Sequence, residues 1–239
     1  MNPVRPIRLP VLFYLPLLMA CGSKPTHVAT PTHTTQPAHP REETQLAVSS
    51  EIGALNEDAV NRVFEKAQHG LMSCVKKGAS HVELLSGDIA IYVGINQTGQ
   101  AEDARLERST LGDRDTEACM IQVLRGRTWP IPVGGRKGQV RKSFSFDMPN
   151  DARPPVEWTA DDIEDTLKKL KKHVEACTGG GSGTYQITAY IDTRGSAISV
   201  GVAPPDTVGE SKIDCLVTLV KGAKFKSPGS YPAKVSFEL

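Results

Sequence analysis

The chain of 239 residues has few aromatic side chains and almost no excess of either charge. Phe, Trp and Tyr make up 5% of the residues and all hydrophobic types 39%, so any core must be aliphatic and modest in size. Lys and Arg total 28, against 27 Asp and Glu. This balance provides no field that would gather nucleic acid or another polyanion. We therefore expect no nucleic-acid partner.

The sequence also lacks the motifs that mark common catalytic and metal sites. It has no Gly-x-Ser-x-Gly elbow, no His-Glu-x-x-His motif and no Cys-x-x-Cys pair. The glycine-rich run at residues 179–183 precedes a predicted strand, so it lacks the helix N-terminus that would hold a phosphate. We expect no catalytic residue, no resident metal and no cofactor.

No hydrophobic run near the N-terminus is long enough to span a bilayer. Arg5 and Arg8 precede an uncharged run at residues 9–20, whereas a transmembrane helix needs about 20 apolar residues. A basic segment followed by a short apolar run is typical of a secretory signal. Residues 1–20 are therefore predicted to be a leader that is removed.

The end of this leader resembles the lipobox of bacterial lipoproteins. It reads Leu18-Met19-Ala20-Cys21-Gly22, with a small residue before the cysteine. The resemblance implies that Cys21 becomes the acylated first residue and that several acyl chains anchor the protein in a membrane. Because Gly22 rather than Asp follows Cys21, the resemblance also implies the outer membrane, with the protein facing the periplasm or the cell surface.

Residues 21–50 are predicted to be a disordered tether. They are rich in Pro, Thr, Ser, His and Gln and contain no aromatic residue, so they cannot bury enough apolar surface to fold. A six-residue repeat places His27, His33 and His39 two residues after a proline. This repeat is either a weak metal site or a duplicated spacer, and the extended Pro-rich chain favours the spacer because it holds the three histidines apart.

The rest of the chain is an internal duplication that aligns on Gly99 and Gly195. Without any gap, the matched pairs are Ile91 with Ile187, Ile95 with Ile191, Cys119 with Cys215, Gly126 with Gly222, and Trp129 with Phe225. The duplication predicts two modules, at residues 51–150 and 155–239.

Each module is predicted to contain a helix, a hairpin, a second helix and a final strand. Apolar residues at a spacing of three and four predict the first helix, and alternating apolar residues around Gly99 or Gly195 predict the hairpin. Asp113 is expected to cap the second helix of module 1. The final strands are expected at 140–146 and 233–237. The fold class is therefore α+β, with two tandem modules that each have a three-stranded antiparallel sheet and two helices on one face.

Four cysteines remain after Cys21, which allows three pairings. Each module has one cysteine late in its first helix and one in its second, and a secreted protein reaches an oxidising compartment. The duplicated positions favour Cys74 with Cys119 and Cys177 with Cys215 over a metal or redox site.

The first module resembles the AgmX/PglI C-terminal domain, a family of envelope proteins related in fold to the TonB C-terminal domain. The motifs that carry this resemblance are Cys74, Gly87-Asp88-Ile89-Ala90-Ile91, Thr98-Gly99, Ser109-Thr110-Leu111, Cys119, Trp129-Pro130-Ile131-Pro132 and Gly134-Gly135. The second module departs at several of them, with Pro204-Pro205-Asp206 in place of Ser-Thr-Leu and Phe225 in place of Trp. The resemblance implies a periplasmic binding or adaptor module of gliding-motility or envelope machinery, with no catalytic residues.

Three functions are consistent with these observations. The first is a lipid-anchored, non-enzymatic binding or adaptor protein whose envelope protein or peptide partner is unknown. The others are an enzyme acting on cell-wall or envelope polymers, which would need a cleft that gathers His69 or His81 with carboxylates, and a purely structural subunit of a complex. Trp129 could stack on a ligand, but Phe225 at the matching position favours core packing.

An open three-stranded sheet has two edges, and an edge strand can accept a partner segment as a further strand. The resemblance to the TonB C-terminal fold implies the same mode. The candidate edges are the two final strands, with Val140, Lys142 and Phe144 in module 1 and Ala233, Val235 and Phe237 in module 2. The lysines in these strands equally suit edge protection, and each edge could instead be covered by the other module.

Replacing Cys21 by serine tests the anchor. We expect Cys21→Ser to block acylation and processing, because serine cannot form the thioether. The wild-type protein should partition into the detergent phase and the variant should not carry acyl chains, as measured by mass spectrometry of the purified protein. Unchanged processing and membrane retention in the variant would contradict the prediction.

Overall fold

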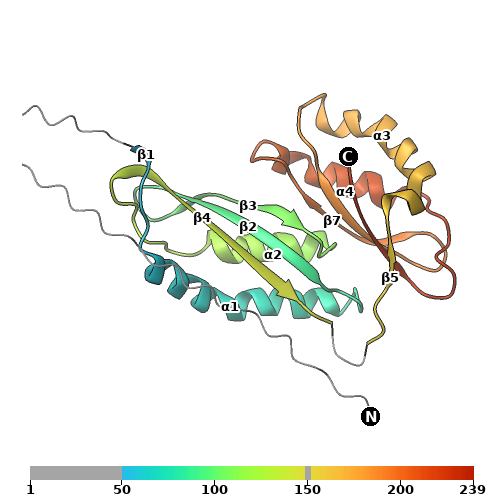
Figure 1. The fold of residues 1–239 in the computed structure, drawn as a ribbon, viewed down its shortest axis with the longest axis horizontal. Coiled ribbons are helices and arrows are strands. Elements are labelled where there is room, and N and C mark those ends of the chain that lie inside the picture. Colours follow the sequence, from blue (N-terminus) through green and yellow to red (C-terminus); the bar gives the residue numbers. More distant parts are fainter. Residues whose placement is uncertain (1–49, 149–151) are drawn as a thin grey trace, which may run out of the picture. The chain divides into compact units, whose positions relative to one another are not determined.

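The computed structural model describes residues 50–148 and 152–239. Cys21 and the tether lie outside the described residues. Module 1 has a four-stranded sheet of order β1-β4-β2-β3 with two helices (Figure 1). Its elements are β1 (Ser50–Ile52), α1 (Glu57–Ala79), β2 (Gly87–Ile95), β3 (Ala101–Ser109), α2 (Arg114–Arg125) and β4 (Gly135–Phe146).

Module 2 repeats the arrangement with a sheet of order β5-β8-β6-β7. Two short 3₁₀ helices, η1 and η2, precede its α-helices. Its elements are β5 (Val156–Trp158), η1 (Ala160–Ile163), α3 (Glu164–Thr178), β6 (Gln186–Ile191), β7 (Ala197–Ala203), η2 (Gly209–Lys212), α4 (Ile213–Lys221) and β8 (Ala233–Glu238). The α+β class and the repeated order of elements are as predicted.

Polar side chains fix the starts of the helices. The Asn56 side chain accepts a hydrogen bond from the Ala59 amide at the start of α1, and Asp113 accepts one from the Thr116 amide at the start of α2. Thr159 and Asp162 form a capping box at η1. These side chains satisfy amides that the first turn leaves without a partner.

The hairpin glycines have the same structural role in both modules. Gly99 and Gly195 have φ angles of 77° and 78°, in the left-handed region that favours glycine. A Cβ atom on either residue would lie within 2.4 Å of the carbonyl oxygen of Trp129 or Phe225, respectively. The Trp129 amide donates to the Gly99 carbonyl at 2.8 Å, and the Phe225 amide donates to the Gly195 carbonyl at 3.0 Å. The paired Gly and aromatic positions that define the duplication are therefore in direct contact.

Trp129 and Phe225 are core residues, as their matching positions predicted. Both side chains are buried, and the Trp129 ring packs edge-on against Phe64 of α1 at 5.3 Å between centroids. The Trp129 indole N–H donates to the Leu124 carbonyl. The tryptophan is therefore not available for stacking on a ligand.

The three-stranded sheet predicted for each module is wrong by one strand. β1 pairs in parallel with the start of β4, and β5 pairs in parallel with β8. Each added strand has three residues, which is too short to show an alternating pattern in the sequence. The extra strands change which edges are open, as described below.

Both disulfides have the pairing that the duplication predicted. Cys74 of α1 bonds to Cys119 of α2, and Cys177 of α3 bonds to Cys215 of α4, at sequence separations of 45 and 38. Each bond therefore ties the two helices of one module together.

We expect the Cys177→Ala/Cys215→Ala variant to lose about 4 kcal/mol of unfolding free energy, because a loop of this length gains conformational freedom in the unfolded chain. Urea denaturation of the variant and of the oxidised wild type measures the difference. Non-reducing peptide maps serve as the control. A link between the modules, or free thiols in the native protein, would contradict the pairing.

Candidate functional site

The edge of β4 that faces away from β2 is open over most of its length. β1 contacts only the start of β4, with Ser50 opposite Gly135 and Ile52 opposite Lys137. β2 pairs with β4 through to Phe146 on the other side. Among residues 50–148 and 152–239, no strand pairs with the outer side of residues 139–146. This segment includes the predicted edge residues Val140, Lys142 and Phe144.

Two hydrogen bonds identify which amides of β4 face outward. The Lys137 carbonyl accepts from the Gly53 amide on the β1 side, and the Asp88 carbonyl of β2 accepts from Thr110 on the β3 side. Backbone groups alternate along a strand, and Asp88 is opposite Ser145. The N–H and C=O groups of Arg141, Ser143 and Ser145 therefore point away from β2, whereas those of Val140 point toward it.

A groove of about 590 Å³ runs between this edge and α1. Phe64, Leu71 and Met72 of α1 form one wall, and Phe144 and Phe146 of β4 form the other. The walls are in contact, because the rings of Phe64 and Phe144 lie 5.8 Å apart. Met72 is half exposed in the groove.

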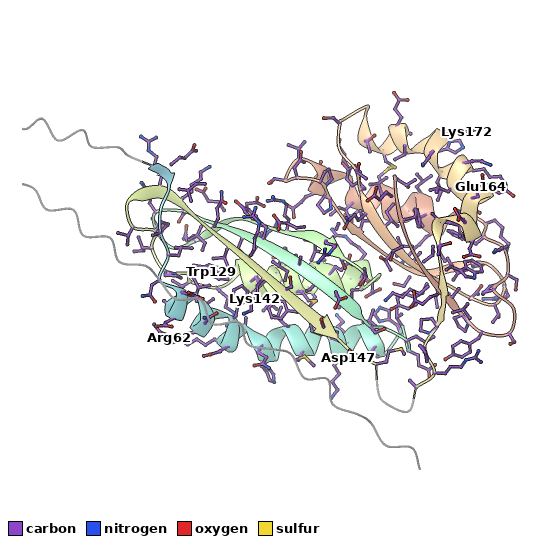
Figure 2. All side chains as sticks on the ribbon, viewed as in Figure 1. Arg62, Trp129, Lys142, Asp147, Glu164 and Lys172 are labelled. Atoms are coloured by element: carbon purple, nitrogen blue, oxygen red, sulfur yellow. A yellow bond between two sulfur atoms is a disulfide. The ribbon has the colours of Figure 1, made fainter. Side chains whose placement is uncertain are left out.

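Charged groups also line this groove. Glu65 lies on the α1 wall and Lys142 on the β4 wall. Figure 2 labels Lys142 on β4, beside α1, and its Nζ atom lies 5.9 Å from the Phe64 ring. The groove therefore combines walls that are mostly apolar, one acidic and one basic side chain, and a free strand edge.

The corresponding edge of module 2 is not open, which corrects the prediction for Ala233 and Val235. β5 pairs with β8 from Val156 opposite Ala233 to Trp158 opposite Val235. Phe237 lies beyond β5, but its side chain is buried in the core of module 2. The final strands of the two modules match in sequence pattern, and β1 and β5 have three residues each. β4 has twelve residues and β8 has six, so β5 covers half of β8 whereas β1 leaves residues 139–146 of β4 unpaired on that side.

Side chains of α2 bind backbone groups on the outer edges of β3 and β7. An Nη group of Arg125 donates to the Ala104 carbonyl of β3 at 2.8 Å and also binds Glu210 of module 2. Oε2 of Glu117 accepts from the Val202 amide of β7 at 3.1 Å. Charged side chains directed at an edge prevent further pairing there.

The outer face of the module 2 sheet packs against module 1. Tyr190 is fully buried within the core cluster of module 1, and its hydroxyl donates to the Ser86 carbonyl. Lys234 Nζ donates to the same carbonyl at 2.7 Å, and Thr188 Oγ1 donates to the Ser109 carbonyl at 3.3 Å. The sheet face that would otherwise be solvent-exposed in module 2 is therefore occupied.

Two carboxylates at the start of α2 lie within this contact. Asp113 Oδ1 accepts from Ser199 of β7 at 2.6 Å, and Glu117 Oε1 accepts from Ser109 at 2.6 Å. Burial raises the pKa of Glu117 from 4.5 to about 7, although the hydrogen bonds from Ser109, Val202 and Gly112 act against it. Burial also raises the pKa of Asp113, but the hydrogen bonds from Ser199 and Thr116 outweigh it and leave that pKa below its ordinary value.

These groups were not predicted as part of a contact. The sequence indicated Asp113 as a helix cap, and that role is confirmed, but its second oxygen binds Ser199. Glu117 and Tyr190 were not identified as site residues. Glu117 lies one turn after Asp113 on the same face of α2, next to the buried Met120 and Ile121. This place on the apolar face of the helix was the sequence feature that could have predicted its burial.

The histidines considered for catalysis do not form a catalytic arrangement. Nε2 of His81 lies 3.4 Å from Asp113, but the hydroxyl of Thr116 donates to the carboxylate and not to the histidine. His81 lines a small cavity between α1 and α2 together with Cys74 and Cys119, and these two cysteines are joined in a disulfide. His69 is exposed on α1 and does not line that cavity.

Two further findings concern the described residues as a whole. No three His, Cys, Asp or Glu side chains gather there in a way that could hold a metal ion. None of the helices in that part of the chain combines the length and hydropathy needed to cross a membrane.

Comparison with known proteins gives one structural likeness. No protein-family model and no curated protein matches the chain. Among solved structures, the chain is similar to the solution structure of the Helicobacter pylori TonB C-terminal domain, with 18% identity and a TM-score of 0.29 over 41% of this chain and 98% of that one. A likeness at this level says nothing about binding, and membership of the AgmX/PglI family stays a prediction.

Glu117→Gln tests the electrostatics of the contact between the modules. The folded pKa of about 7 lies above the ordinary 4.5, so ionisation lowers wild-type stability progressively between these pH values, by about 3 kcal/mol at most. Gln remains neutral, and its amide can donate to Ser109 while its oxygen accepts from Val202. We expect the variant to gain stability relative to wild type as pH rises from 5 to 8.

Urea denaturation at pH 5 and pH 8 measures this difference. Glu65→Gln, on the solvent side of α1, is the matched control and should show no such change. If the difference in unfolding free energy between wild type and Glu117→Gln is the same at both pH values, the raised pKa of Glu117 is contradicted.

Proposed function

We propose that the protein is a lipid-anchored, non-enzymatic binding protein of the bacterial envelope that captures an extended segment of a partner along β4. The observation that carries this proposal is the free edge at residues 139–146, which runs beside an apolar groove. Among the described residues, α2 side chains contact the β3 and β7 edges, β5 pairs with β8, and the outermost strands β1 and β5 have only three residues each. β4 is therefore the best acceptor.

A partner segment would add to β4 as a further strand. The outward N–H and C=O groups of Arg141, Ser143 and Ser145 would supply the main-chain hydrogen bonds that give affinity. Every second side chain of the added strand would point toward α1, where it would meet Phe64, Met72 and Phe144. Specificity would come from these alternate positions.

Module 2 would support this site rather than duplicate it. Its β8 edge is paired with β5, and the outer face of its sheet contacts module 1 through Tyr190 and Lys234. We therefore infer one partner segment for each chain.

The leader and tether would place this site away from a membrane. Acylated Cys21 would be separated from Ser50 by a spacer that spans at most about 100 Å when fully extended. An anchored protein with such a spacer can reach a partner held elsewhere in the envelope. This fits an adaptor in a motility or envelope-spanning machine, as the resemblance to the AgmX/PglI family implies.

An enzymatic role is less well supported by the same geometry. Ser145 lines the groove and its hydroxyl donates to the Asp88 carboxylate, but no histidine lines the groove and His81 lies outside it. A catalytic site requires convergent groups with a nucleophile or base aimed at one position. A binding role uses the groove and edge as they stand.

Ser143→Pro tests strand addition at β4. Proline removes the outward N–H of residue 143 and places its ring where a partner strand would lie, while the hydrogen bonds to β2 are kept. With a photoreactive amino acid at Gln139, we expect cross-linking to the partner in intact cells to fall about tenfold in Ser143→Pro.

Ser143→Ala is the matched control, because it keeps the amide, and should cross-link as the wild type does. A photoreactive residue at Lys172 on α3 controls for non-specific contacts. Thermal unfolding must show that the proline variant is folded. Undiminished cross-linking of folded Ser143→Pro would overturn strand addition at this edge.

A further inference from the structure

We propose that the segment captured by β4 is acidic, with carboxylates on alternate residues and apolar side chains between them. This inference rests on the proposed function, since it names the chemistry of the partner at the same edge. It follows from the distribution of charge along β4. The strand carries Arg136, Lys137, Arg141 and Lys142, and no Asp or Glu occurs anywhere in residues 118–146.

The two faces of β4 differ in chemistry. Val140, Lys142, Phe144 and Phe146 alternate on the side that faces α1, where Val140 and Phe146 are buried. Lys137 and Arg141 lie on the opposite side with Gln139, Ser143 and Ser145, all of them exposed. A strand added along residues 139–146 therefore meets apolar side chains and Lys142 on one face and Arg141 on the other. Lys137 lies at the end of the open segment, where β1 pairs with β4.

Acidic groups lie beside these cations, and Arg141 stays partly exposed. Glu107 of β3 accepts from Nε of Arg141 at 3.0 Å, and the Arg141 side chain is still 58% exposed. Asp88 accepts from the Ser145 hydroxyl at 2.6 Å, and because a hydroxyl neutralises no charge, Asp88 disfavours a partner carboxylate beside Ser145. Glu65 lies on the groove side, where it disfavours an acid, and this places the carboxylates of the partner on the outer face.

The same cations oppose pairing between two copies of this chain. Because β1 occupies the edge at Lys137, two copies would have to pair along residues 139–146, and registers centred on Arg141 or Lys142 would place that cation of one copy opposite the same cation of the other. Like charges directly opposite each other destabilise a sheet. Charge complementarity therefore favours an acidic strand over a second copy as the occupant of the edge.

Synthetic peptides test this charge preference. The acidic probe alternates valine with glutamate over eight residues, the neutral probe has glutamine in place of glutamate, and the basic probe has lysine. We expect the chain comprising residues 21–239, with Cys21→Ser so that no acyl chain is present, to bind the acidic probe at least about ten times more tightly than the basic one. Fluorescence anisotropy measures each dissociation constant.

Two variants assign the preference to β4. Lys137→Gln/Arg141→Gln should weaken binding of the acidic probe about tenfold and leave the neutral probe unchanged. Lys171→Gln/Lys172→Gln, which neutralises two exposed lysines on α3, is the matched control and should bind all three probes as the wild type does. Thermal unfolding verifies that each variant is folded.

The outcomes separate this inference from the proposed function. Equal affinity for the acidic and basic probes, with all binding lost in Ser143→Pro, would overturn the charge preference and keep strand addition. Binding that survives in folded Ser143→Pro would overturn strand addition itself. A dimer in sedimentation that Ser143→Pro dissociates would show that a second copy occupies the edge, and would overturn the inference as well.

Discussion

The contact between α2 and β7 is the constraint on which the rest of the structure depends. Glu117 binds the Val202 amide while Arg125 binds the Ala104 carbonyl and Glu210, so one helix obstructs two sheet edges and joins two modules. Burying a carboxylate is costly unless it is hydrogen-bonded, and the donors of Glu117 come from both modules. The two modules therefore form a single unit, and within the described part of the chain residues 139–146 of β4 keep an accessible edge.

The duplicated framework could be predicted from the sequence because its signals are local. Gly99 and Gly195 need a positive φ, and their contacts with Trp129 and Phe225 explain why these positions recur at a fixed spacing. The cysteines followed from the same alignment. β1 and β5 could not be predicted, because strands of three residues show no periodicity and gain stability only from pairing with β4 and β8.

The candidate site was predicted in part for a related reason. Val140, Lys142 and Phe144 were expected at an edge and lie at one, whereas Ala233 and Val235 were expected at an edge and are paired with β5. Both strands alternate in the same way, so their own sequences cannot distinguish them. The direction of each amide was also undetermined, because it depends on the pairing register that joins Asp88 to Ser145.

The contact between the modules is heterologous, because each module contributes a different surface to it. Small residues of module 2, such as Gly201, admit Glu117, and a Cβ there would lie 2.2 Å from its carboxylate. In the gapless alignment Gly201 corresponds to Arg105, and Asp113 and Glu117 correspond to Gly209 and Ile213. Module 1 thus lacks the receptive sheet face, and module 2 lacks the carboxylates. The residues that form this head-to-tail contact are therefore not repeated on the other side of either module, so the same contact cannot be formed there.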